Sequence, residues 1–286
     1  MQGDFPPPAD QGAVEVAGGR RVGYARWGIE GPVVLSFHGS PGSRYLALGP
    51  EVADSLGVRL ISLERPGFGR SDFSADRTIG SWAADVAKVA DHFSIAEFAV
   101  VGTSAGGPYA LACAAHLHER VARTGVVAGV LPPQFYDSDP LIDLAATDRS
   151  EAERAVRAHY AQLARDIDGS VDQLGAADGP DAAIYRRPAV QELFRQARTE
   201  AFRQGIDAAV LDLLLANSPW DFRLEDISSP VLFWHGEVDP ITPLDVILRA
   251  CATMPAAHAR VFPGEGHAIG FAHASEILDE LTAPWR

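Results

Sequence analysis

Short, nearly continuous apolar runs, separated by helix-like patterns, constrain the fold of this chain most strongly. The runs occupy residues 32–37, 58–63, 98–101 and 231–234. Runs of this length and composition are typical of strands buried on both faces of a parallel sheet. Helix-like segments lie between and after them, at 81–93, 105–117, 244–254 and 275–281. The alternation predicts an α/β fold with a doubly wound, mostly parallel sheet.

Two further strand signals extend this pattern. Residues 124–130 form a weaker apolar run and predict a fifth strand of the sheet. Residues 13–16 and 21–27 are β-prone and flank the pair Gly18-Gly19, which predicts a β-hairpin near the start of the chain.

The alternation stops between about residues 132 and 220. Amphipathic helical patterns occur there, for example at 151–163 and 189–204. The strand pattern resumes directly afterwards, at residue 231. We therefore expect a helical cap over residues 132–220, inserted into a core made of residues 1–131 and 221–286.

Charge and apolar composition limit which partners and which cellular compartment we expect for this chain. The chain has 286 residues, a net charge of −14 and no basic run, which argues against nucleic acid as a partner. The first residues lack the pattern of a secretory signal, and no apolar run approaches the roughly 20 residues that span a bilayer. The expectation is a cytoplasmic protein with no membrane partner. The oligomeric state is left open.

The pentapeptide Gly102-Thr103-Ser104-Ala105-Gly106 is the strongest chemical signal. It follows the apolar run at 98–101 and opens a helical pattern, which is the strand–turn–helix context that makes G-x-S-x-G informative. A tight turn of this kind needs small residues on both sides of the serine and lifts its hydroxyl clear of the sheet. Ser104 is therefore the candidate nucleophile.

A serine nucleophile needs a base within hydrogen-bond reach and a carboxylate that orients the base. His267 follows an apolar run and is preceded by Gly266, so we expect its ring on a loop above the sheet. Asp239 lies just beyond the run at 231–234 and completes the order serine, aspartate, histidine. Glu237 is a rival for the acid and stays open, whereas Asp226 precedes its strand and should lie at the wrong end of the sheet.

The loop His38-Gly39-Ser40-Pro41-Gly42 follows the first long apolar run and is the candidate oxyanion loop. Pro41 has no N–H, so the amide of Ser40 is one expected donor. The amide of Ala105, directly after the nucleophile, is the other. His38 and Gly39 are expected to order the loop. The sequence has no metal-ligand cysteine spacing, and no metal is expected.

Jointly, five segments resemble the α/β-hydrolase superfamily, in its branch with a helical cap. They are HGSPGS (38–43), ERPGFGRSD (64–72), GTSAGG (102–107), HGEVDP (235–240) and PGEGH (263–267). They cover most of the chain outside the cap and follow the family's order. The resemblance implies hydrolysis through an acyl-enzyme, with no cofactor, at a site between core and cap.

Three departures refine this resemblance. Glu64 stands where the family usually has Asp, at a position that is normally structural. Ser104 stands where dehalogenase-like and epoxide-hydrolase-like members have Asp, which argues against both chemistries. HGSPG is similar to the HGGPG of proline iminopeptidases except at Ser40. That activity would need a cap carboxylate to hold an amine; Glu200, Asp207 and Asp212 are available, but we expect them to be surface carboxylates.

The expected function is a serine hydrolase acting on a small-molecule substrate, a carboxylic ester of a small or medium, partly apolar compound. An amidase or aminopeptidase, a C–C bond hydrolase acting on diketones, and a lactonase could use the same three residues. A ligand-binding protein without turnover is the alternative of another class, because this fold also serves as a receptor or scaffold.

Overall fold

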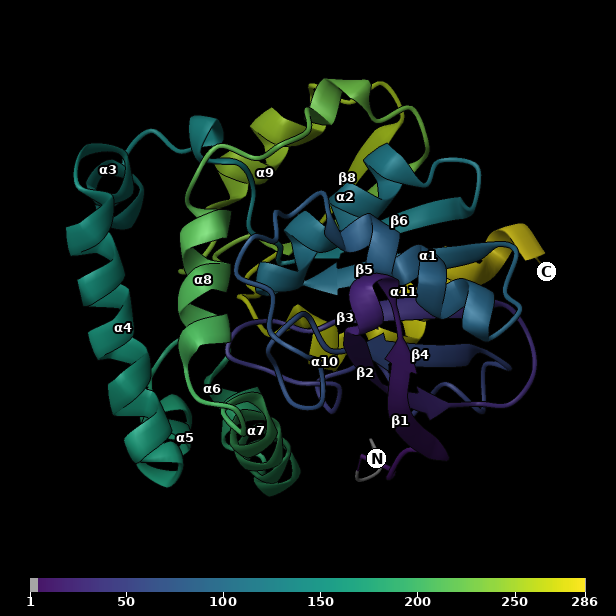
Figure 1. Cartoon of the computed structure of the whole chain (residues 1–286), viewed down its shortest axis with the longest axis horizontal. Coiled ribbons are helices and arrows are strands. Elements are labelled where there is room, and N and C mark those ends of the chain that lie inside the picture. The colour runs from purple at the N-terminus through teal and green to yellow at the C-terminus, as the bar shows by residue number, and fades with distance from the viewer. Residues whose placement is uncertain (1–4, 286) are drawn as a thin grey trace.

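The apolar runs pair into one eight-stranded sheet in the computed structural model, which describes residues 5–285 (Figure 1). The strand order is β1-β2-β4-β3-β5-β6-β7-β8. The bounds are β1 (Asp10–Glu15), β2 (Arg21–Trp27), β3 (Val33–Phe37), β4 (Arg59–Leu63), β5 (Phe98–Thr103), β6 (Val121–Val127), β7 (Val231–Gly236) and β8 (Ala257–Phe262).

The pairing confirms the predicted sheet. β1 and β2 form the antiparallel hairpin, and β2 also pairs antiparallel with β4. All pairs from β4 through β3, β5, β6 and β7 to β8 are parallel. The fifth run was placed a few residues too late. β6 starts at Val121 and ends at Val127, because Ala128 has a φ of 46° that extended backbone does not adopt.

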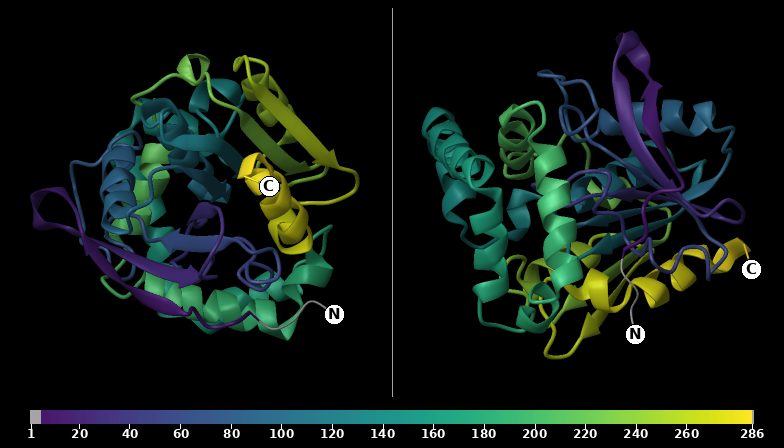
Figure 2. Two further views of the ribbon diagram at one scale, coloured as in Figure 1. Left: turned by 90° about the vertical axis from the view of Figure 1, so that its right-hand side faces the viewer. Right: turned by 90° about the horizontal axis from the view of Figure 1, so that it is seen from below.

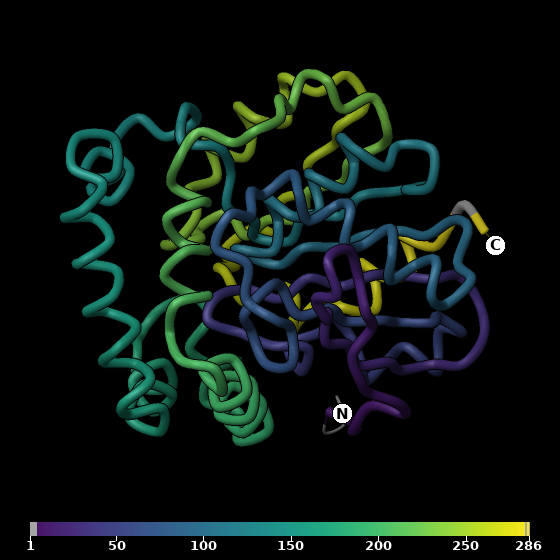
Figure 3. Tube along the Cα trace, viewed as in Figure 1, coloured from purple at the N-terminus to yellow at the C-terminus, as the bar shows by residue number. Residues whose placement is uncertain are grey.

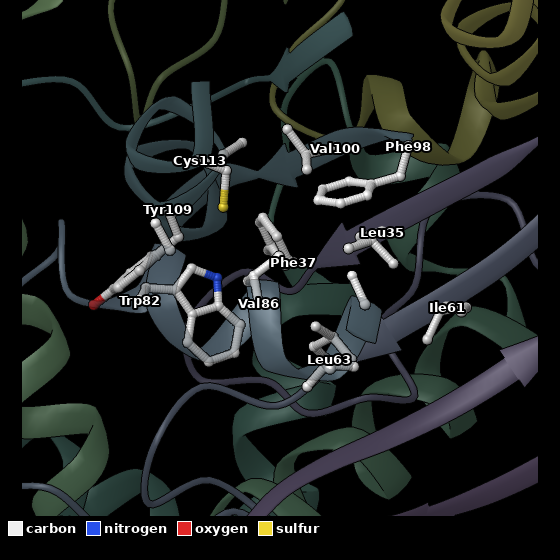
Figure 4. Close-up of a cluster of buried hydrophobic side chains, with 14 of the residues drawn as sticks. Leu35, Phe37, Ile61, Leu63, Trp82, Val86, Phe98, Val100, Tyr109 and Cys113 are labelled. Carbon is white, nitrogen blue, oxygen red and sulfur yellow. The ribbon is translucent and has the colours of Figure 1, made fainter. Parts of the chain in front are cut away.

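Helices cover both faces of the sheet. α1 (Trp82–His92) and α2 (Gly107–His116) pack on one face, together with α9 (Leu244–Cys251) beside β7. α11 (Ala274–Thr282) packs on the opposite face, and the short α10 (Ile269–Ala272) precedes it. Figure 4 shows side chains of β3, β4 and β5 meeting Trp82 and Val86 of α1 and Tyr109 and Cys113 of α2. The sheet is therefore doubly wound, as expected.

Six α-helices occupy the chain between β6 and β7. They are α3 (Pro140–Thr147), α4 (Arg149–Arg165), α5 (Ile167–Ala176), α6 (Ala182–Tyr185), α7 (Pro188–Ala201) and α8 (Asp207–Ala216). The traces in Figures 2 and 3 show these helices together on one side of the molecule, away from the C-terminus. Asp139, Asp148 and Asp166 accept amide hydrogen bonds at the starts of α3, α4 and α5, which accounts for part of the acidity of this insertion.

A buried ionic cluster joins these six helices (residues 140–216, called the cap below) to the rest of the chain, called the core. Asp212 of α8 accepts hydrogen bonds from Arg65 Nη2 (2.7 Å), Arg77 Nη2 (3.0 Å) and the hydroxyl of Tyr109 (2.5 Å). Burial alone would raise the pKa of Asp212, but the charges of Arg65 and Arg77 outweigh burial and lower it to about 2. The expectation that Asp212 is a surface carboxylate was wrong, because one face of α8 turns inward onto the core.

Asp212→Asn is expected to lower the free energy of unfolding by about 3 kcal/mol, because two buried arginines lose their counter-charge. Urea unfolding at neutral pH measures the loss. Asp207→Asn is the matched control on the same helix: Asp207 is exposed and pairs with Arg157 at the surface, so its effect should stay within about 0.5 kcal/mol. Equal effects of the two substitutions would contradict a structural role for the buried cluster.

The pH dependence gives a second readout of the same cluster. The lowered pKa of Asp212 stabilises the fold above about pH 4, and this contribution is lost as the pH falls towards 2. The stability of the Asn variant should therefore change less than that of wild type between pH 4 and pH 2.

Candidate active site

Ser104 lies on a strained turn between β5 and α2. Its φ is 53°, in the left-handed region that residues with a side chain rarely adopt. Two glycines make the turn possible. A Cβ on Gly102 would lie 2.2 Å from the carbonyl oxygen of Gly106, and one on Gly106 would lie 2.2 Å from that of Phe37. The turn holds Ser104 beyond the carboxyl end of β5, where the sequence predicted it.

His267 lies on the loop that follows β8, and Asp239 lies on the loop that follows β7. His267 Nδ1 lies 2.8 Å from Asp239 Oδ2, and the side chain of Asp239 is fully buried. The two loops are tied together by backbone hydrogen bonds from Val238 to Glu265 (3.0 Å) and from Glu237 to Phe262 (3.0 Å). Residues that are 28 positions apart in sequence are thereby fixed in contact.

The carboxylate of Asp239 has several donors besides the histidine. Its Oδ1 accepts from the amides of Ile241 (2.8 Å) and Thr242 (3.1 Å), and its Oδ2 from the hydroxyl of Thr242 (2.8 Å). Burial alone would raise the pKa of Asp239, but the hydrogen bond and charge of His267, together with these amides, hold it below its ordinary value. Asp239 is thus kept as an ionised acceptor for the histidine.

The two rival acids lie elsewhere. Glu237 is exposed, and its carboxylate accepts from the amide of Gly264 at 3.0 Å. Asp226 is also exposed and precedes β7, at the opposite end of the strand from Asp239. Of the three acids, Asp239 is the one in contact with His267.

The loop after β3 lies against the nucleophile turn. A Cβ on Gly39 would lie only 3.3 Å from Cβ of Ser104, so this position favours glycine. The hydroxyls of Ser40 and Tyr160 of α4 lie 3.2 Å apart, which links the loop to the cap. Among residues 5–285, no protein group accepts a hydrogen bond from the amide of Ser40. The backbone of this loop therefore lies close to Ser104, and the N–H of Ser40 is available to donate to a bound molecule.

His38 is fully buried at the base of this loop. Its Nδ1 donates to the carbonyl of Gly39 (2.7 Å), and its Nε2 accepts from the amide of Arg65 (3.4 Å). Burial, reinforced by the charge of Arg65, lowers the pKa of His38 well below its ordinary value, so the ring is neutral at physiological pH. Both nitrogens are occupied by the backbone, an arrangement that orders the loop and leaves no nitrogen to serve as a base.

A cavity of about 230 Å³ joins these elements. Ser104 and His267 lie in its wall together with Gly39 and Ser40. Most of the remaining wall is apolar, and the cap contributes Leu174, Tyr185, Phe194 and Arg198. Residues of the core and of the cap line the cavity together, and its mostly apolar wall with a few polar groups is typical of small-molecule sites.

Asp181, in the cap just before α6, was missed by sequence reasoning. It is buried, and its carboxylate accepts from the amides of His267 (2.8 Å) and Ala268 (3.0 Å). The local sequence Asp178-Gly179-Pro180-Asp181 reads as an ordinary turn and carries no signal of this contact. A cap side chain thus holds the backbone on which His267 is mounted.

Asp181→Ala is expected to lower kcat by about tenfold, because two buried amides lose their acceptor and the loop bearing His267 loosens. Steady-state kinetics on any substrate that is turned over measure this. Asp178→Ala is the matched control, since Asp178 belongs to the same turn but its side chain is 99% exposed and pairs with Arg186. Equal rates for Asp181→Ala and wild type would show that the contact does not support the histidine.

One more expectation about cap charges needs correction. Glu200 was expected at the surface, yet it is largely buried and pairs with Arg44 at 2.6 Å; Asp207 is at the surface as expected. The arginines of α7 also differ in exposure. Arg203, just after the helix, pairs with Glu200, whereas Arg198 is buried and donates to the hydroxyl of Ser170 on α5. Arg198 lies on the inward face of α7, and this position decides its partner.

Metal sites and membrane-spanning helices are two other features that the described part of the chain lacks. Residues 5–285 contain no group of three or more His, Cys, Asp or Glu side chains that could hold a metal ion. Across the same residues, no helix is both long enough and apolar enough to cross a bilayer.

Comparison with known proteins places this architecture in a family. A family model described as the alpha/beta hydrolase fold matches residues 32–274. The chain belongs to the alpha/beta hydrolase family. The matched range includes Ser104, Asp239, His267 and the whole cap of this alpha/beta hydrolase.

Relatives along nearly the full length of this alpha/beta hydrolase have different substrates. It is 28% identical over 269 residues to the 2-hydroxy-6-oxo-2,4-heptadienoate hydrolase of Pseudomonas putida, covering 91% of this chain and 90% of the relative. It is 26% identical over 284 residues to a bifunctional esterase/perhydrolase of Acinetobacter calcoaceticus, covering 95% and 98%. The malate-bound structure of a thermophilic esterase from Thermogutta terrifontis superposes on this chain with a TM-score of 0.71, and the two sequences are 24% identical. The superposition covers 96% of this chain and 100% of the esterase, so the two proteins share a fold.

Proposed function

We propose that this alpha/beta hydrolase is a serine hydrolase with Ser104 as nucleophile, His267 as base and Asp239 as the acid that orients the base. One observation carries the proposal: the His267–Asp239 pair and the strained Ser104 turn face one small cavity. Backbone strain at a residue with a side chain is typical of a functional position. A serine with a purely structural role in a turn would not need the positive φ of Ser104.

In the first half of the reaction, His267 Nε2 takes the hydroxyl proton of Ser104 while Oγ bonds to the carbonyl carbon of the substrate. The oxyanion that forms receives hydrogen bonds from the amides of Ser40 and Ala105. The carbon–oxygen bond to the alcohol then breaks, and His267 returns the proton to the leaving alcohol. An acyl group remains on Ser104.

In the second half, a water molecule gives a proton to His267 as its oxygen bonds to the acyl carbon. The bond from the acyl carbon to Ser104 Oγ breaks, the proton returns to Ser104, and a carboxylic acid leaves. Asp239 stays ionised throughout and stabilises the imidazolium in both halves. The free amide of Ser40 and the position of Ala105 at the start of a helical turn support the proposed oxyanion donors.

The leading substrate class is a carboxylic ester of a small or medium, partly apolar compound, because the cavity is small and mostly apolar. A relative that is an esterase/perhydrolase agrees with this class. The second candidate is cleavage of a C–C bond next to a ketone with the same three residues. It is favoured by the relative that hydrolyses 2-hydroxy-6-oxo-2,4-heptadienoate.

The test is a substrate panel at fixed enzyme concentration. It comprises p-nitrophenyl esters from acetate to decanoate, the matching p-nitroanilides, and 2-hydroxy-6-oxo-2,4-heptadienoate, each run beside the Ser104→Ala protein as the blank. We expect turnover of the esters with a preference for one chain length, set by the cavity. Turnover of the dienoate alone would replace the ester assignment by the C–C assignment, and no turnover of any member would favour the ligand-binding alternative.

A further inference from the structure

Arg198 of α7 is a buried cation in the wall of the active-site cavity. Only 9% of the residue is exposed, although it lies on a surface helix. Its Nη1 donates to the hydroxyl of Ser170 (2.6 Å), and its guanidinium lies 5.5 Å from the ring centroid of Phe194. Its Nε is buried and has no hydrogen-bond partner. Both partners are uncharged.

No carboxylate compensates this charge: among residues 5–285, Arg198 makes no ion pair. The neighbouring arginines of the helix differ from it, since Arg195 pairs with Asp168 and Asp172, and Arg203 pairs with Glu200. Burial lowers the pKa of Arg198, yet an arginine side chain remains charged in proteins. A buried, unpaired cation is costly and is retained where something else supplies the anion.

The position of Arg198 connects it with the reacting groups. It lines the same cavity as Ser104 and His267, and leucines and phenylalanines form much of the wall around these three residues. A planar guanidinium is suited to two parallel hydrogen bonds with a carboxylate. We propose that Arg198 is a substrate-binding residue and that the natural substrate carries a carboxylate on an apolar chain, at a distance from the bond that Ser104 attacks.

Two other polar residues of the cavity wall, Glu51 and Tyr185, bear on whether a substrate carboxylate can bind beside Arg198. Glu51 also lines the cavity; burial raises the pKa of its carboxyl, and the charge of Arg187 opposes this shift and offsets part of the negative charge there. Tyr185 lines the cavity as well, and burial raises the pKa of its hydroxyl, which therefore stays protonated as a potential donor. Asp181 is occupied by the amides of His267 and Ala268.

This inference rests on the proposed serine hydrolase, and its first test compares two matched esters. Mono-p-nitrophenyl esters of adipate, suberate and azelate carry a terminal carboxylate, and their terminal carboxamide analogues have nearly the same shape without charge. We expect wild type to prefer the carboxylate in kcat/KM by about tenfold to a hundredfold. Arg198→Gln should abolish this preference, and Arg198→Lys should restore part of it. Arg195→Gln, three positions earlier on the same helix, should leave the preference in place.

A second measurement does not depend on turnover. In titration calorimetry, the free dicarboxylates should bind the Ser104→Ala protein. The double variant Ser104→Ala/Arg198→Gln should bind them at least tenfold more weakly. Thermal melts record whether the double variant is folded. The inference is overturned if wild type does not discriminate between carboxylate and carboxamide, or if Arg198→Gln discriminates equally. Ser104-dependent hydrolysis without discrimination would refute the subsite alone, whereas dicarboxylate binding without any turnover would refute the hydrolase alone.

Discussion

Replacing Ser104 with alanine is expected to lower kcat/KM by at least about a thousandfold. The substitution removes the atom that forms the acyl-enzyme and leaves the cavity and the oxyanion donors in place. Alanine also fits the turn no worse than serine, since both residues carry a Cβ at the same positive φ. The loss should therefore appear in activity and not in stability, as measured by ester hydrolysis and thermal unfolding of the same samples.

Ser55→Ala is the matched control, because Ser55 is an exposed serine whose hydroxyl donates to the backbone carbonyl of Val52 at 2.9 Å. Its activity should equal that of wild type. A Ser104→Ala protein that kept activity within a few-fold of wild type would place the nucleophile elsewhere.

Asp239→Asn is expected to lower kcat by about 10⁴-fold. The two amides of Ile241 and Thr242 on Oδ1 require an acceptor there, so the new amide nitrogen must take the position of Oδ2. That nitrogen would donate towards His267 Nδ1, which lies 2.8 Å from Oδ2 in the wild type. The ring must then carry its proton on Nε2, the nitrogen that has to accept the proton of Ser104.

Glu237→Gln separates the two acids that the sequence left open. Glu237 contacts the amide of Gly264 and is exposed, so its substitution should change kcat by less than about threefold. Steady-state kinetics of both variants on one ester decide between them. A large loss in Glu237→Gln with a small loss in Asp239→Asn would reverse the assignment.

The sheet could be predicted because its strands are buried on both faces and so appear as continuous apolar runs. The loops after these strands are equally readable. Parallel strands end at one edge, so motifs that follow β3, β5, β7 and β8 must meet there, although Ser104 and His267 are far apart in sequence. The weak run that became β6 was misplaced, because backbone strain at Ala128 ends it and composition does not show strain.

The cap contributions could not be predicted in the same way. An amphipathic helix shows which face is apolar, but not which polar residue turns inward once helices pack. Asp212 and Arg198 both look like surface charges in sequence and are both buried. Asp181 lies 86 positions from His267 and reaches its amide through the packing of the cap against the core. Such long-range contacts depend on tertiary packing and leave no local pattern.

Labelling with a fluorophosphonate tests the central claim most directly, because this reagent phosphonylates serines that are activated by a neighbouring base. The protein is treated with the probe, and the site is located by mass spectrometry of its peptides. The account predicts one adduct per chain, on the peptide that contains Ser104, with none in Ser104→Ala and strongly slowed formation in Asp239→Asn. An unlabelled wild-type protein, or an adduct on another serine, would contradict it.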